Sequence, residues 1–164
     1  MTNQYGNETI PTTRGADTTS LPVDSHGRVS KDDLRNFILN YIRTSSALNG
    51  KKPADGSTYK VDGSAESWAA FFVWLVGRES DYQVKNVGDV GLFDGNSNGL
   101  FQLSPNDAMN YHVRDTKFTL KELQDPVFNT TVAMKIAEHL VLQTNSIRSG
   151  IGRYWGPVKR GGHP

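Results

Sequence analysis

Two stretches of the chain carry helical patterns of apolar residues, and they differ in how much of the helix surface is apolar. In residues 31–47, apolar side chains recur at intervals of three and four, which places them on one face of a helix. They are Leu34, Phe37, Ile38, Tyr41 and Ile42. In residues 65–79, the run from Trp68 to Val76 is apolar on every side, so this helix is expected at the centre of the fold. Ser30 and Ser64 precede the two patterns and are suited to cap the helices.

The remainder of the chain has fewer regular patterns. Residues 81–98 are rich in Gly, Asp and Asn without a helical period, which predicts a loop or short strands. Further helices are expected at 105–110 and at 125–143, and glycines interrupt the C-terminus after residue 149. These elements predict a mainly α fold of one domain, with a glycine-rich loop or small β insertion after the central helix.

The first 28 residues differ in composition from the rest. They hold six threonines and two prolines, and their apolar residues are scattered. Such a segment buries too little apolar surface to offset the entropy of ordering it. We therefore predict a flexible N-terminal arm over 1–28 and a folded domain over 29–164, which is the size of one domain.

Composition excludes several classes of protein. The chain has no cysteine, which excludes a disulfide scaffold, an iron–sulfur cluster and thiol catalysis. The 18 Lys and Arg balance 17 Asp and Glu, so binding to nucleic acid is not expected. No apolar run reaches the roughly 18 residues of a membrane span, and no secretory signal peptide is visible. No cofactor or metal is expected either.

Glu79 stands out among the five glutamates. Leu75, Phe72 and Trp68 precede it at four, seven and eleven residues, so Glu79 continues the apolar stripe at the C-terminal end of its helix. Partial desolvation there would raise the pKa of the carboxyl toward that of a general acid at neutral pH. The alternative is a structural glutamate that accepts hydrogen bonds from loop amides.

Glu79 also begins a series of four short motifs. Ser80 follows it directly, and after the glycine-rich stretch come Gly99 to Leu103 and then Pro105 with Ala108. An Asn-containing helix start lies at residues 125–129. The last motif is Arg153, Tyr154, Trp155, Gly156 and Pro157.

In this order the motifs resemble those of the soluble lytic transglycosylase and goose-type lysozyme superfamily, over about residues 64–160. The chain departs from the family pattern at three positions, where Phe101 replaces a Met, Ala133 replaces a Gly and Trp155 stands in a shortened Tyr motif. The resemblance implies a lysozyme-like fold and a peptidoglycan glycosidase (muramidase) that cleaves between N-acetylmuramic acid and N-acetylglucosamine.

The resemblance also implies residues for the site. Glu79 would be the general acid, while Gln102 and Tyr154 would contact the scissile sugars or orient Glu79, and Ser80 is expected to help bind substrate. The interval between Glu79 and Gln102 is longer than in typical transglycosylases and carries Asp89 and Asp94. Because goose-type enzymes place helper aspartates in this region, we favour Asp94 as the residue that positions water, and hydrolysis over transglycosylation.

Residues 94–99 fit the first half of a calcium loop. The twelfth position of a complete EF-hand loop is a glutamate, and here it is Pro105, which argues against that site. A looser calcium site on Asp94, Asn96 and Asn98 and a simple polar turn remain as alternatives. A non-catalytic glycan- or calcium-binding module of the same fold is therefore the rival to an enzyme.

Two further features leave alternatives open. Tyr111, Tyr154 and Trp155 suit either stacking on sugar faces or closing the core. Residues 139–164 contain no acid but include Arg148, Arg153, Lys159 and Arg160. This tail either is a solvated basic segment or attracts anionic cell-wall peptides.

A wall-cutting enzyme without a signal peptide needs another route to its substrate. Phage lysis enzymes use membrane holes, and glycosidase effectors of type VI secretion are injected into a competitor. The threonine-rich arm and single domain resemble the latter more. We therefore expect an interbacterial toxin that acts in the periplasm or cell wall of a target bacterium, with an immunity protein as its partner.

Overall fold

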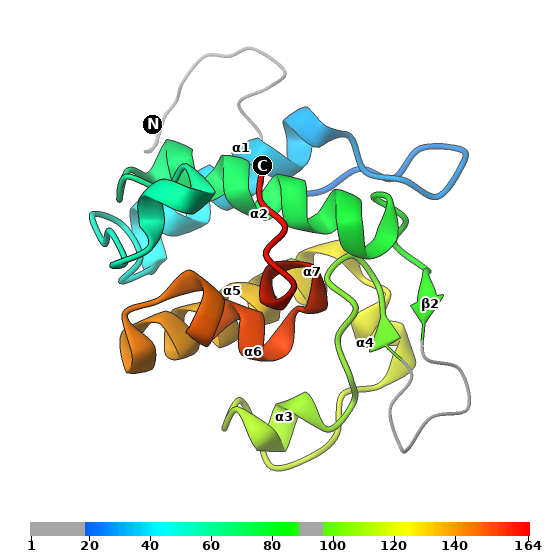
Figure 1. The fold of residues 1–164 in the computed structure, drawn as a ribbon. Helices are drawn as coiled ribbons and strands as arrows, with labels where there is room; N and C mark the ends of the chain where they lie inside the picture. Colours follow the sequence, from blue (N-terminus) through cyan, green and yellow to red (C-terminus); the bar gives the residue numbers. More distant parts are fainter. Residues whose placement is uncertain (1–18, 89–96) are drawn as a thin grey trace.

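The computed structural model describes residues 19–88 and 97–164, and helices dominate both parts. Helix α1 (Lys31–Ser45) packs along α2 (Ala65–Ser80), and a 3-10 turn, η2 (Gly56–Tyr59), lies in the connection between them. Ser30 and Ser64 cap α1 and α2 through their hydroxyls, as predicted. In Figure 1, α2 crosses the molecule, with α5 (Pro126–Thr144) and the short C-terminal helices below it.

The small β insertion predicted after α2 is confirmed. Strands β2 (Val87–Gly88) and β3 (Ser97–Asn98) pair antiparallel, with Val87 opposite Asn98. The chain then forms α3 (Asp107–Asn110) and α4 (Leu120–Leu123) before it enters α5. Helix α3 begins two residues later than the pattern predicted, and α4 was not predicted. Its capping box joins Thr119 and Glu122, which stabilises a single turn too short to show a period.

The core surrounds α2, as its apolar run predicted. Trp68, Phe72 and Leu75 are completely buried, and the Trp68 ring stacks on that of Phe72 with 5.7 Å between centroids. Phe101 and Trp155 extend this aromatic cluster toward the C-terminal segment. Among the described helices, none is long and apolar enough to cross a membrane.

The C-terminus is more regular than its glycines suggested. A π-helical turn, η3 (Ile147–Ile151), leads into α6 (Gly152–Tyr154) and α7 (Gly156–Lys159). The Asp55 carboxylate, from the loop before η2, accepts hydrogen bonds from the Ser146 hydroxyl and from the amides of Ile147 and Arg148. This cap satisfies the first amides of η3, so the glycines are tolerated.

The predicted arm over 1–28 is described only from residue 19. Leu21 is buried in the core, and Arg28 bridges Gln83 in the segment that follows α2. Leu21 and Arg28 therefore contact the domain, and the boundary at residue 28 stays a prediction. A single apolar residue in a polar stretch gives no periodic signal for such packing.

Candidate active site

Glu79 lies in the last turn of α2, and the chain reverses direction immediately after it. Asp81 and Tyr82 both adopt left-handed backbone conformations, with φ of 52° and 64°. The Asp81 amide donates to the Gly77 carbonyl and closes the helix. The Arg28 guanidinium donates to the main-chain carbonyl and the carboxylate of Asp81, at 3.1 and 2.9 Å. The half-buried Glu79 side chain therefore lies at a helix end that Arg28 holds in place through Asp81.

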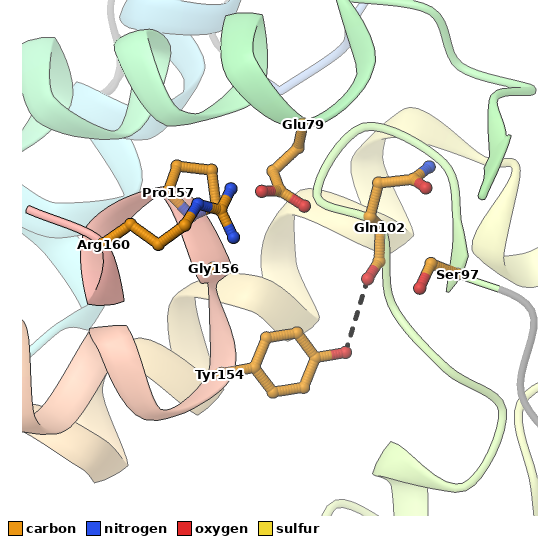
Figure 2. A pocket seen from close by; sticks show the side chains of 7 residues that line it. All are labelled: Glu79, Ser97, Gln102, Tyr154, Gly156, Pro157 and Arg160. Carbon is orange, nitrogen blue, oxygen red and sulfur yellow. Dashed lines mark hydrogen bonds between the residues drawn. The ribbon is translucent and has the colours of Figure 1, made fainter. Parts of the chain in front are cut away.

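The next wall of the site is the turn at Gln102. This residue also has a left-handed conformation, with φ of 53°, and its side-chain amide donates to the carbonyls of Asn86 and Gly99 at 3.0 and 2.9 Å. A Cβ atom on Gly88 would lie 2.5 Å from Gln102 Oε1, so a side chain there would displace the Gln102 amide. The Gln102 side chain therefore joins the turn to β2, and its main-chain carbonyl faces Tyr154 (Figure 2).

Asn129 holds this turn from behind. Its side-chain amide donates to the carbonyls of Asn98 and Leu123, and its oxygen accepts from the Phe101 amide at 2.9 Å. The asparagine of the predicted helix start is thus completely buried and ties α5 to the Gln102 turn. Gly99 lies against it with φ of 79°, and a Cβ there would meet the Leu123 carbonyl at 2.2 Å.

The C-terminal segment forms the third wall. Trp155 is buried and its indole donates to the Phe101 carbonyl at 2.9 Å, so this residue closes the core. Tyr154 is half-buried, and its hydroxyl contacts both the Asp107 carboxylate and the Gln102 carbonyl. Its ring meets that of Tyr111 edge-on, with 5.8 Å between centroids.

These three walls enclose one polar pocket of about 310 Å³. Its described lining comes from α2, β3, the Gln102 turn and the C-terminal helices, and the Glu79 carboxylate and the Arg160 guanidinium point into it (Figure 2). The lining residues are Glu79, Ser97, Gln102, Tyr154, Gly156, Pro157 and Arg160.

The pocket brings together Glu79, Gln102 and Tyr154, which sequence motifs had singled out. Ser80 is buried instead, and its hydroxyl donates to the Val76 carbonyl at 3.2 Å, so its expected contact with substrate stays a prediction. Asp94, the expected helper, lies outside the described residues, as does Asp89. Glu79 is the one carboxylate in the described lining.

Two residues of the pocket lining were not predicted as site residues. Ser97 was not singled out, and Arg160 was noted only as part of a basic tail. The Arg160 guanidinium lies against Gly156, where a Cβ would lie 2.6 Å from Nη1, so a side chain at residue 156 would make Arg160 shift. The glycine before Pro157 was the one available signal for this approach.

The alternative calcium site on Asp94, Asn96 and Asn98 lies mostly outside the described residues. Asp94 and Asn96 fall outside them, and Asn98 is buried in β3. Over residues 19–88 and 97–164, no three His, Asp or Glu side chains gather as a metal site.

Comparison with known proteins shows a likeness of fold. No protein-family model and no curated protein match this chain. Solved structures of DslA, a Bdellovibrio protein, do resemble it. The wild-type form has a TM-score of 0.63 and 18% identity, covering 82% of this chain and 85% of that one. Two variants, each with one glutamate replaced by glutamine, have TM-scores of 0.62 and 20% identity. The first match covers 75% of this chain and 78% of the DslA chain, and the second covers 84% and 85%.

Proposed function

We propose that this protein is a peptidoglycan-degrading glycosidase of the lysozyme-like superfamily, with Glu79 as its general acid. The observation that carries the proposal is the convergence of Glu79, Gln102 and Tyr154, from three separate motifs, on one polar pocket. Its substrate would be the β-1,4 bond between N-acetylmuramic acid and N-acetylglucosamine in the glycan strand.

The chemistry requires a proton donor beside the glycosidic oxygen. Glu79 transfers its proton to that oxygen as the bond to the anomeric carbon breaks, and the carboxylate formed then stabilises the positive charge on the sugar. Water or a hydroxyl of the same sugar attacks the anomeric carbon and returns a proton to Glu79. One carboxylate is enough when the sugar's own group attacks, and Asp94 or Asp89 would assist when water attacks.

The test is the loss of turbidity of purified cell walls. Glu79→Gln keeps the shape of the side chain but carries no transferable proton, so we expect a loss of about a hundredfold or more in rate. Glu66→Gln is the matched control, since Glu66 lies in the first turn of the same helix and pairs with Arg43 on the surface. Undiminished lysis by Glu79→Gln would contradict the assignment, and wall binding without released fragments would favour a glycan-binding module.

Mass spectrometry of the released fragments distinguishes the two outcomes of the reaction. Reducing ends indicate attack by water, and anhydro ends indicate attack by the sugar's own hydroxyl. We expect reducing ends, and we expect Asp94→Asn to lower their yield more than Asp89→Asn does. Anhydro ends alone would make the enzyme a lytic transglycosylase.

The biological setting is an interbacterial toxin that acts in the periplasm or wall of the target. A concave pocket gives an immunity protein a target in which a few inserted side chains dominate binding. Expression in a bacterium should be toxic only with an added periplasmic signal, and a co-expressed neighbouring gene should relieve the toxicity. Equal killing by the unmodified cytosolic chain, or no protection by a neighbour, would contradict this setting.

A further inference from the structure

One buried carboxylate lies directly behind the pocket. Asp107, the first residue of α3, is only 4% exposed, and it is the one charged side chain among the buried polar residues that the structure describes. Carboxylates are rarely buried without a partner. No Lys or Arg within the described residues forms an ion pair with it.

Hydrogen bonds take the place of an ion pair. Asp107 Oδ2 accepts from the Ser104 amide at 2.7 Å and from the Tyr154 hydroxyl. The first bond fixes the turn before α3 and has a local purpose. The second reaches across 47 residues to a side chain that lines the pocket with Glu79.

The Tyr154 hydroxyl therefore stands between two acceptors but has one hydrogen to donate. The Gln102 carbonyl lies 3.5 Å away, at the limit of a hydrogen bond, whereas the contact with Asp107 is short and charge-assisted. The hydrogen thus points to Asp107, and the lone pairs of the phenol oxygen are left for the pocket.

We propose that Asp107 is a positioning residue of the active site: it holds the hydrogen of Tyr154, so that the phenol oxygen accepts a hydrogen bond from a ligand hydroxyl or amide beside Glu79. Without this partner the hydrogen could turn to the Gln102 carbonyl or to the pocket, so the phenol oxygen would no longer be a fixed acceptor. The proposal rests on the proposed function for its catalytic consequence.

The titration behaviour of the pair agrees with this geometry. Burial and, after it, the charge of Asp107 raise the pKa of the Tyr154 phenol well above its usual value, so the phenol keeps its hydrogen. Burial also raises the pKa of the Asp107 carboxyl, although the bonds from Tyr154 and Ser104 oppose this. Acid should therefore protonate Asp107 and weaken the hydrogen bond that it accepts from the Tyr154 hydroxyl. Three other groups that can carry charge lie near the pair. Tyr111 faces it, the charge of Arg153 lowers the pKa of Tyr111, and the His139 ring contacts the Tyr111 ring. Glu79 lines the same pocket as Tyr154.

A double-mutant cycle tests the proposal on wall digestion. Asp107→Ser, which removes the acceptor of the Tyr154 hydroxyl, should lower kcat between about twofold and tenfold, the effect of one hydrogen bond, with KM unchanged. In a Tyr154→Phe background the same substitution should cause no further loss. Asp125→Ser is the matched control, because Asp125 caps α5 away from the pocket and Ser caps equally well. An equal loss in both backgrounds, or no loss in either, would overturn the proposal.

A spectroscopic readout makes the test independent of catalysis. In the full chain labelled with ¹³C at tyrosine Cζ, the Tyr154 signal is identified by its disappearance in Tyr154→Phe. It should shift on acidification in the natural chain and lose that step in Asp107→Asn. A step that persists in Asp107→Asn would overturn the proposal even if the protein cuts walls. If the step is lost as expected but Glu79→Gln lyses walls normally, only the proposed function fails.

Asp107→Asn removes the titrating carboxyl but keeps an oxygen that can accept from Tyr154, so Asp107→Ser is the variant that breaks this bond. Its hydroxyl can still accept from the Ser104 amide but is too short to reach Tyr154. The same loss of kcat and of the acid step is expected, and thermal unfolding confirms that the variant is folded.

Discussion

Glu79 and Tyr154 line one pocket, but the chain positions them by different means. Glu79 ends a helix of 16 residues whose apolar side chains are buried on every turn. Tyr154 belongs to a helix of three residues between two glycines. Its place depends on single polar contacts from distant segments, such as the Trp155 indole on Phe101 and the Asp55 cap on η3.

The difference predicts how substitutions in each wall should affect stability and activity. Burial along α2 is spread over many side chains, so its loss costs stability before it moves Glu79. The C-terminal wall rests on a few hydrogen bonds, so losing one should displace pocket residues at a smaller cost in stability. The substitutions below test this contrast, beginning with the largest expected effect.

The largest loss of stability is expected at the beginning of α2. Trp68 is completely buried, stacks on Phe72 and donates its indole hydrogen to the Lys51 carbonyl at 3.0 Å. Trp68→Ala should lower the free energy of unfolding by about 3–5 kcal/mol. Because eleven residues of helix separate it from Glu79, the folded fraction should keep its activity. Urea unfolding and wall lysis at low temperature measure the two effects, with the exposed Leu142→Ala as the control.

Stability and activity should both fall when Asn129 is replaced, because this residue of α5 supports the Gln102 turn. Asn129→Ala leaves the amide of Phe101 and the carbonyls of Asn98 and Leu123 without their partner. Unsatisfied buried groups cost about 1–3 kcal/mol each, so a loss of about 3 kcal/mol is expected together with a loss of activity. Asn110→Ala, at an exposed position in α3, should change neither quantity. Full activity in Asn129→Ala would show that the turn needs no support from α5.

Activity should suffer more than stability at Trp155. Trp155→Phe keeps an aromatic ring in the core but removes the donor to the Phe101 carbonyl, which should cost about 1–3 kcal/mol. The neighbouring Tyr154 ring, 4.5 Å away, should shift with it and lower the rate of wall lysis. Trp74→Phe is the control, since the Trp74 indole makes no hydrogen bond in the described part of the chain. Equal rates in the two variants would contradict the contrast.

The same contrast explains what could be predicted from the sequence. Periodic burial identified α1, α2 and α5, and it singled out Glu79 because a carboxylate interrupts an apolar stripe at a helix end. The insertion after α2 followed from its glycines and its lack of a period. Gln102 and Tyr154 came from motif resemblance, since no periodicity marks them.

The remaining features depend on contacts between distant residues. Nothing in the local sequence indicates that Asp107 is buried or that it meets a tyrosine 47 residues later. The first amides of η3 are capped by Asp55, more than 90 residues earlier in the chain. A pattern that is read along the chain records neither contact.

The Asp55 cap also predicts a dependence on pH. Burial favours the protonated acid, but hydrogen bonds from the Arg148 and Ile147 amides and the Ser146 hydroxyl together lower the pKa of Asp55 below its usual value of 3.8. Its stabilising contribution is therefore complete above the unfolded pKa and is lost as pH falls through the lower pKa of the folded state. Asp55→Asn should cost about 1 kcal/mol at pH 7, and the difference from the natural chain should shrink below about pH 4. A difference that is constant with pH would show that the charge of Asp55 does not contribute.

The smallest effect on stability is expected at Arg160, where only ligand binding should change. Its side chain is exposed, lines the pocket and makes no hydrogen bond or ion pair within the described residues, so Arg160→Gln should alter stability by less than about 0.5 kcal/mol. If the basic tail attracts the anionic peptides of the cell wall, the Arg160 guanidinium would do so inside the pocket, and salt screens such an exposed contact. We therefore expect KM for peptidoglycan to rise severalfold at low ionic strength and the difference to vanish at about 1 M salt. Uncharged chitin oligomers should bind both forms equally. Lys159→Gln removes a neighbouring charge outside the pocket lining, so an equal rise in KM there would mean that the whole basic tail, and not Arg160 in the pocket, attracts the wall.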